Sequence, residues 1–376
     1  MNTTIQDYLL QHMKQKPISF HMPGHKGSDI YKRFGYEVFL ENLIDFDITE
    51  ITGADNLFQA EGIIKETQEG YAKIYDVNKS YLLINGSSGG ILASILATVQ
   101  KGKKIIMARN CHKSVFNALI LADIQPLYVY PQIIEEYGIS GEITVDEIER
   151  LLSENTEVEA VILPSPNYYG ICSDIDTIAK VVHNYNKILI VDQAHGAHLK
   201  LFENYGIKGL PKSAEESGAD IIINSTHKTL ASMTQSAVLN LKSNRVDRDM
   251  LEDKLQCVQS SSPSYILMVS LDINRKIIEN HGFQLMKEWA NNLNYFYNET
   301  KSINGLKVIN NLDNFDFTKI NLDMSEIGIS GTELEQLLLK ENIFIELTTG
   351  NIAMCMTGIG NKRNDFHQAF KCDSEY

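Results

Sequence analysis

Short apolar runs alternate with longer segments of helical period between about residues 79 and 241. Most of these runs are apolar nearly throughout, which is typical of strands buried on both faces of a sheet. The segments between them have the apolar spacing of helices that cover such a sheet. The predicted strands are residues 80–85, 103–109, 126–130, 158–164, 187–192, 220–224 and 236–241. The pattern therefore predicts an α/β fold with a seven-stranded, mostly parallel sheet.

The last predicted strand has a different connection from the others. Only a short loop precedes residues 236–241, and it leaves too little chain for a crossover helix, so we expect this strand to pair antiparallel. From Ser243 the pattern changes to a charged helix, a long helix and further short strands, which predicts a smaller α+β part. We expect three parts: an N-terminal segment (1–60) that packs on the large domain, a large ligand-binding domain (61–262) and a small C-terminal domain (263–376).

The composition is that of an ordinary globular protein. Of the 376 residues, 43% are hydrophobic and 22% are charged, so the chain can bury a full core in about two domains. The net charge of −14 argues against nucleic-acid binding, which uses a basic face to displace counterions from phosphates.

The cysteines and the N-terminus bear on cellular location. The five cysteines are scattered with no CxxC pair, which suits a reducing compartment and offers no zinc knuckle. The first twenty residues carry polar side chains where a secretory signal would be apolar. The most apolar segment, residues 81–99, is interrupted by NGSSGG, whereas a membrane span needs about 20 apolar residues. We expect a cytoplasmic protein with no membrane partner.

A candidate phosphate site follows the first predicted strand. Residues 85–90 read NGSSGG and lead directly into a helical segment. Small residues let backbone N–H groups approach an anion, and the start of the helix adds a partial positive charge. Gly86, Ser87 and Ser88 are therefore candidate phosphate ligands, although a Gly/Ser turn between a strand and a helix is also common without any ligand.

A second candidate group follows residues 187–192, where the sequence reads DQAHGAHL from Asp192. A carboxylate at the end of a buried strand is costly unless a cationic or proton-donating group meets it. A protonated pyridine nitrogen is one such group. Two alternatives remain open here: Asp192, His195 and His198 could hold a metal, or the histidines could be ordinary buried polar residues.

Lys228 is the third candidate group, beside the phosphate site and Asp192. It follows residues 220–224 at the same predicted edge of the sheet as the phosphate site and Asp192. Burial disfavours an ammonium and makes the amine a competent nucleophile for a carbonyl. A phosphate anchor, a buried carboxylate and a buried lysine are what a pyridoxal 5'-phosphate (PLP) site needs. A surface lysine at a strand end would explain Lys228 alone but not the three groups together.

The chain resembles the bacterial Orn/Lys/Arg decarboxylase family of fold type I PLP enzymes. The matching stretches run in the family's order over most of the first 270 residues. They are FHMPGHKG (20–27), DITEITGADNLF (47–58), NGSSGG (85–90), ARNCHKSVFNALILA (108–122), PNYYG (166–170), VDQAHGAHL (191–199), STHK (225–228) and SSSPSY (260–265).

The resemblance implies a role for each matching residue. Lys228 would bind PLP as a Schiff base, Asp192 would pair with the pyridine nitrogen, and His112 would stack on the ring. The other implied cofactor contacts are Gly86, Ser87, Ser88, Ala194, His195, Ser225 and His227. In this family the site lies between two subunits, so Ser261 or Ser262 would reach the partner's cofactor. A homodimer would be the minimum unit, with the N-terminal segment (1–60) at its interface.

The implied reaction is α-decarboxylation of lysine, arginine or ornithine to a diamine or agmatine, as in polyamine biosynthesis. An acidic residue should meet the distal cation of the substrate, and Glu346 is the candidate. No metal is expected. Transamination or aldol cleavage remains an alternative, because the cofactor groups define the chemistry only as far as the Schiff base. A catalytically idle PLP-binding paralogue is a second alternative.

The sequence departs from the family pattern at two places. Gln193 stands where family members often have glutamate, as in DEAHGAH. The C-terminal part is short compared with the family, so we expect an abbreviated second domain that lacks part of the wall around the substrate side chain.

Overall fold

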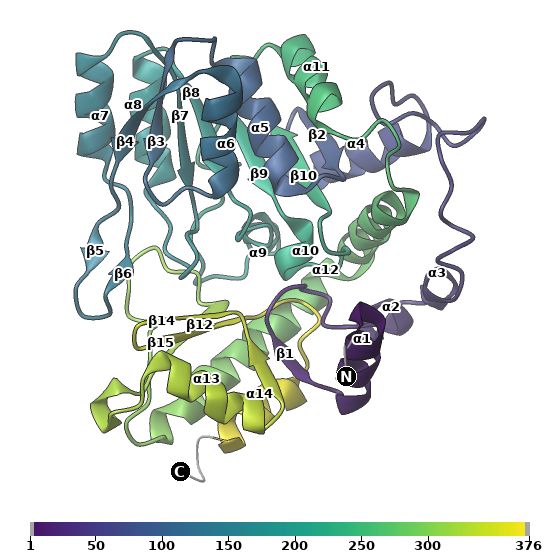
Figure 1. The fold of residues 1–376 in the computed structure, drawn as a ribbon, viewed down its shortest axis with the longest axis vertical. Helices are drawn as coiled ribbons and strands as arrows, with labels where there is room; N and C mark the ends of the chain where they lie inside the picture. The colour runs from purple at the N-terminus through teal and green to yellow at the C-terminus, as the bar shows by residue number, and fades with distance from the viewer. Residues whose placement is uncertain (1–3, 373–376) are drawn as a thin grey trace.

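A computed structural model describes residues 4–372 of the chain and has a seven-stranded sheet in its larger part (Figure 1). The strands, in spatial order, are β2 (Lys79–Leu83), β10 (Ala237–Leu241), β9 (Ile221–Asn224), β8 (Ile188–Asp192), β7 (Val158–Pro164), β3 (Lys104–Ala108) and β4 (Gln125–Val129). β10 is antiparallel to both of its neighbours, and the other pairs are parallel. The predicted seven-stranded, mostly parallel sheet with one antiparallel strand is confirmed.

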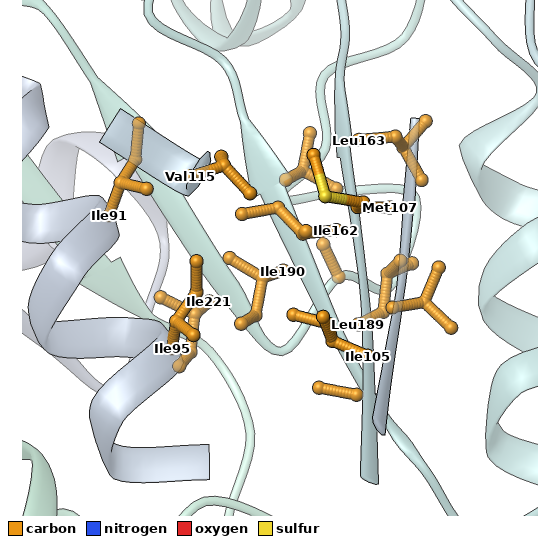
Figure 2. Packing of buried hydrophobic residues seen from close by; sticks show 14 of the residues in the cluster. Ile91, Ile95, Ile105, Met107, Val115, Ile162, Leu163, Leu189, Ile190 and Ile221 are labelled. Carbon is orange, nitrogen blue, oxygen red and sulfur yellow. The ribbon is translucent and has the colours of Figure 1, made fainter. Parts of the chain in front are cut away.

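Helices follow most of these strands and cover the sheet. They are α4 (Ile63–Tyr75), α5 (Gly86–Thr98), α6 (Lys113–Ala122), α7 (Val145–Glu154), α8 (Ile175–Asn184), α9 (Leu199–Asn204), α10 (Thr226–Thr229) and α11 (Arg248–Val258). Figure 2 shows Ile91 and Ile95 of α5 and Val115 of α6 among strand residues such as Ile190 and Ile221. All five of these side chains are fully buried. This dry packing holds the carboxyl ends of the strands in fixed relative positions.

The C-terminal part has its own four-stranded sheet. Its strands, in spatial order, are β11 (Lys307–Val308), β12 (Lys319–Asp323), β15 (Ile352–Met356) and β14 (Leu347–Thr349). The helices around it are α12 (Tyr265–Glu299), α13 (Gly331–Lys340) and α14 (Arg363–Cys372). The long α12 runs from the larger part into the smaller one (Figure 1).

The N-terminal segment contacts both parts of the molecule. Its elements are α1 (Ile5–Gln15), β1 (Ile18–Phe20), α2 (Asp29–Arg33) and α3 (Glu37–Glu41). β1 pairs in parallel with β13 (Ile343–Ile345). The Gly24 N–H donates to the His227 carbonyl at 2.7 Å, and the Gly360 N–H donates to the Gly24 carbonyl at 3.0 Å. The division into 1–60, 61–262 and 263–376 stays a prediction.

The remaining strands form a small hairpin, β5 (Ile133–Ile134) with β6 (Ile139–Ser140). Among residues 4–372, no helix combines the length and the apolar content that crossing a bilayer requires. The first helix, α1, begins with a capping box at Thr4 and lies at the margin of the molecule (Figure 1). None of its residues is buried in this single chain.

Candidate active site

A cavity of about 610 Å³ lies at the carboxyl ends of the parallel strands. This is the edge at which open α/β sheets bind ligands. Nine of the residues predicted to contact the cofactor line it: Gly86, Ser87, Ser88, His112, Asp192, Ala194, His195, His227 and Lys228. They lie at or just after the carboxyl ends of β2, β3, β8 and β9, so segments far apart in the sequence meet at one place.

Lys228 lies on the single-turn helix α10, directly after β9. Its Nζ is 2.7 Å from His195 Nε2 and 5.8 Å from the centre of the Tyr168 ring. Burial lowers the pKa of Lys228 to about 8, although the carboxylates of Asp192 and Glu346 partly oppose this change. A substantial fraction of the amine is therefore neutral near physiological pH, as a nucleophile for an aldehyde requires.

Asp192 is the last residue of β8, and its side chain is buried. Its Oδ1 accepts a hydrogen bond from the Ala194 N–H at 3.1 Å. Burial raises the pKa of this carboxyl, and the nearby Lys228 ammonium opposes that rise. A protonated ring nitrogen would supply a cationic donor at this position, so the environment of Asp192 fits a pyridine ring.

His112 is the N-cap residue of α6. Its Nδ1 accepts from the Ser114 backbone N–H at 3.3 Å and lies 2.8 Å from Ser114 Oγ. Because a backbone N–H can only donate, a neutral His112 ring carries its proton on Nε2. Burial lowers the pKa of His112, which favours this neutral form. A neutral, flat ring at the cavity wall suits stacking on another aromatic ring.

The start of α5 and the first residues of α10 with its N-cap Ser225 offer groups for a phosphate. Within residues 4–372, the side chain of the N-cap residue Asn85 makes no capping hydrogen bond to α5, and Gly86 has a φ of 74°. Ser225 is fully buried and does not line the cavity, but its Oγ has no hydrogen-bond partner among residues 4–372. His227 Nδ1 lies 2.8 Å from the Ser236 carbonyl. Uncapped N–H groups and an unpartnered buried hydroxyl fit an anionic group.

The other predicted residues lie outside this cavity. Ser261 and Ser262 are exposed in the turn after α11, so a contact with a partner's cofactor stays a prediction. Glu346 lies between β13 and β14, and its Oε2 accepts from the Met22 N–H at 2.8 Å. Its neighbour Leu347 lines the cavity, as does Met22. Glu346 is thus near the wall without being part of the lining.

The two histidines of the DQAHGAHL loop have different partners. His195 contacts Lys228, whereas His198 Nε2 lies 3.2 Å from Asp316 Oδ1. In the part of the chain that the structure describes, no group of three His, Cys, Asp or Glu side chains is arranged to hold a metal ion. The geometry therefore gives no support to the metal alternative.

Gln193 takes part in a buried polar cluster next to the site. Its Nε2 donates to Glu215 Oε2 at 2.8 Å and to Asn224 Oδ1 at 3.0 Å. Its Oε1 accepts from the Ala214 N–H at 2.7 Å. An amide satisfies all three contacts, and a carboxylate cannot donate the first two. This arrangement gives a physical reason for glutamine at this departure from the family pattern.

Sequence reasoning missed several residues around the site. Tyr168 packs against His195 with ring centres 4.3 Å apart. Asn110 lines the cavity, and its buried Oδ1 has no hydrogen-bond partner in the described part of the chain. Both lie in motifs quoted above, but nothing in the motifs assigns them a role. Asp316 and Lys319 form a fully buried ion pair behind the site. No local signal marks them, because a lysine at the start of a strand is usually exposed.

Comparison with known proteins identifies the family of this chain. The profile of the family described as "Orn/Lys/Arg decarboxylase, major domain" matches residues 3–322. The chain belongs to this family. Its members are PLP-dependent amino-acid decarboxylases, so the predicted family and cofactor are confirmed.

Two curated relatives come from Bacillus subtilis strain 168. "Uncharacterized protein YaaO" is 35% identical over 368 residues, covering 96% of this chain and 75% of the relative. An "Arginine decarboxylase" is 31% identical over 372 residues, with the same coverage of 96% and 75%.

Solved structures establish the fold. The Francisella novicida lysine decarboxylase LdcF aligns with a TM-score of 0.76 and 21% identity, covering 97% of this chain. The chain spans 59% of that structure's length. A SepCysS–SepCysE N-terminal domain complex aligns with a TM-score of 0.70 and 16% identity, covering 100% of this chain and 98% of the other. The fold type I architecture predicted from the sequence is therefore confirmed.

Proposed function

We propose that this protein uses PLP to remove the α-carboxylate of lysine, arginine or ornithine and so forms the corresponding amine. The observation that carries the proposal is the convergence of Lys228, Asp192 and the uncapped start of α5 on one cavity. When bound, PLP supplies a conjugated ring that accepts the electrons left on the α-carbon as CO₂ departs.

The residues of the chain have separate tasks in this proposal. Lys228 provides the amine that holds the cofactor and that the substrate amine displaces. Asp192 keeps a proton on the ring nitrogen, so that negative charge developing in the transition state is stabilised. His112 would stack on one face of the ring when the cofactor is bound. The start of α5, together with Ser225 and His227, holds the phosphate.

A basic substrate is supported by the names of the relatives, which include arginine and lysine decarboxylases. Glu346 is the proposed partner for the distal cation of the substrate. One of its oxygens is held by the Met22 N–H, and its charge acts on Lys228. A carboxylate held at the edge of the cavity would favour a substrate that carries a second positive charge. The choice among lysine, arginine and ornithine stays open.

A transaminase would need an arginine that grips the α-carboxylate of its substrate. The cavity lining includes no arginine within residues 4–372, which favours decarboxylation. A catalytically idle paralogue is disfavoured because Lys228, Asp192 and the phosphate-binding residues are all present in one cavity.

We also propose that the working unit is a cytoplasmic homodimer. The first helix exposes Ile5, Tyr8, Leu9, Leu10 and Met13 in the single chain. An apolar helix face of this kind is typical of a surface that a partner covers. A second copy of the chain would bury this face, and the exposed Ser261 or Ser262 is the proposed contact with the neighbouring cavity.

The decisive experiment combines trapping with product analysis. Borohydride reduction of the protein with PLP should place the label on the peptide that contains Lys228. Separate incubations with lysine, arginine and ornithine should release CO₂ and the matching amine from at least one of them. Lys228→Ala should abolish both signals, whereas Lys180→Ala, at an exposed lysine of α8, should retain both. A label on another lysine, or no amine from any of the three substrates, would refute the proposal.

A further inference from the structure

A buried ion pair from the C-terminal part lies behind the cavity. Asp316 precedes β12 and Lys319 is its first residue, and both side chains are completely buried. Their Nζ and Oδ2 atoms are 3.1 Å apart. The Lys319 ammonium also donates to the carbonyl of His195 at 3.0 Å. Lys319 of the smaller sheet thus binds the backbone of His195, and the ring of His195 contacts Lys228.

Asp316 is held in place by several donors. Its Oδ1 accepts from the Thr318 hydroxyl at 2.6 Å and from the Thr318 N–H at 3.0 Å, and it lies 3.2 Å from His198 Nε2. Burial alone would raise the pKa of Asp316, but the charge of Lys319 and the contact with His198 outweigh this and hold the pKa well below its usual range. The carboxylate therefore stays ionised and keeps Lys319 oriented.

The same segment also supports the other wall of the cavity. The Asp316 N–H donates to the Gly170 carbonyl at 2.7 Å, and Asn321 Nδ2 donates to the Tyr169 carbonyl at 2.9 Å. Tyr168 and Tyr169 line the cavity, and the Tyr168 ring packs on His195. Both loops around the Lys228 amine are therefore anchored to one short stretch of the C-terminal part.

We propose that Lys319 is a positioning residue for Lys228: it holds the His195 carbonyl and so sets the His195 ring against the Lys228 amine, and its buried charge disfavours protonation of that amine. The inference rests on the proposed function in so far as Lys228 is the amine that takes the cofactor. The positive charge of Lys319 also acts on the Lys228 amine. The protonation of Lys228 is therefore the readout, because an ion pair that only stabilised the fold would not change it.

The charges around Lys228 determine the direction of that readout. Burial lowers the pKa of Lys228, Asp192 on β8 and Glu346 beyond β13 raise it, and Lys319 lowers it, with a result of about 8. Four other titratable side chains around the amine are neutral in this pH range, because burial lowers the pKa of three histidines and raises that of a tyrosine: His112, His195, His227 and Tyr168. Lys319 is therefore the positive charge whose removal should make Lys228 easier to protonate.

The test is reductive methylation of the cofactor-free full chain with formaldehyde and cyanoborohydride over a pH series around 8. Mass spectrometry would quantify the Lys228 peptide at each pH. The midpoint is the pH at which methylation of Lys228 reaches half of its maximum. In Lys319→Met this midpoint should move to higher pH by about half a unit or more, which corresponds to about a threefold loss of neutral, reactive amine at neutral pH. Lys319→Arg keeps the charge and should keep the midpoint.

Two further variants keep the test decisive. If Lys319→Met does not fold, Asp316→Asn combined with Lys319→Met leaves no unpaired charge and should show an upward shift of smaller size, because the opposing charge of Asp316 is removed as well. The matched control is Lys200→Met, which removes another buried lysine that pairs with a carboxylate, Glu216, outside the cavity. It should leave the midpoint unchanged.

An unchanged Lys228 midpoint in a folded variant that lacks the Lys319 charge would overturn the inference. A midpoint that moves in Lys200→Met as much as in Lys319→Met would overturn it equally. Because methylation needs no PLP, a shift in Lys319→Met together with a failure of borohydride trapping would refute the proposed function and leave the inference standing.

Discussion

Replacing Gln193 by glutamate would restore a residue that is common in the family, yet we expect it to destabilise this chain at neutral pH. The wild-type amide donates to Glu215 at 2.8 Å and to Asn224 at 3.0 Å in a fully buried setting. In Gln193→Glu both donors are lost, and a second carboxyl group faces the carboxylate of Glu215.

The magnitude follows from the chemistry of paired carboxyl groups. Two buried carboxylates in contact share one proton, and the apparent pKa of that proton rises well above the value in the unfolded chain. A rise of about two units corresponds to about 3 kcal/mol of unfolding free energy. Because the pKa is raised in the folded state, this loss of unfolding free energy is absent below the unfolded-state pKa of about 4. The loss grows as the pH rises from there toward the folded-state pKa.

The assay is urea unfolding of the wild type and of Gln193→Glu at neutral and at mildly acidic pH. We expect the variant to be less stable by about 3 kcal/mol at neutral pH, with a gap that narrows on acidification. Gln193→Met is the matched control, since it removes the hydrogen bonds without adding a charge and should show a deficit that changes less with pH than that of Gln193→Glu. A Gln193→Glu deficit that stays constant with pH, or no deficit at all, would refute this reasoning.

Three further predictions concern the site. Asp192→Asn should still be trapped by borohydride at Lys228 but should turn over at least about a hundredfold more slowly, because the neutral amide cannot keep the ring nitrogen protonated; unchanged turnover would exclude the electron-sink role. A chelator should leave activity unchanged, and metal analysis should find no stoichiometric metal. Activity that is lost on chelation and restored by adding the metal would instead support metal binding by His195 and His198. Gly170→Ala should lower the free energy of unfolding in urea by at least about 1 kcal/mol, because φ is 94° and the new Cβ would lie 2.8 Å from the Asp316 carbonyl oxygen. An unfolding free energy equal to that of the wild type would contradict this geometry.

The sheet and the core of the site could be predicted from the sequence because their signals are local. A strand such as residues 187–192 shows its burial in its own apolar residues, and the short loop after residues 220–224 shows that the next strand pairs antiparallel. Asp192 and Lys228 each stand at the end of such a strand. Since parallel strands end at the same edge of a sheet, strand order along the chain was enough to bring them together.

Only the tertiary structure could decide which groups touch across long separations in the chain. Lys319 is 124 residues from His195, and Gln193 is 22 residues from Glu215, yet each pair shares a buried hydrogen bond. A charged residue is normally exposed, so the sequence by itself gives Lys319 no special meaning. Its role comes from burial: removed from water, an ammonium must be satisfied by fixed partners, and the folding of two distant segments against each other decides which partners those are.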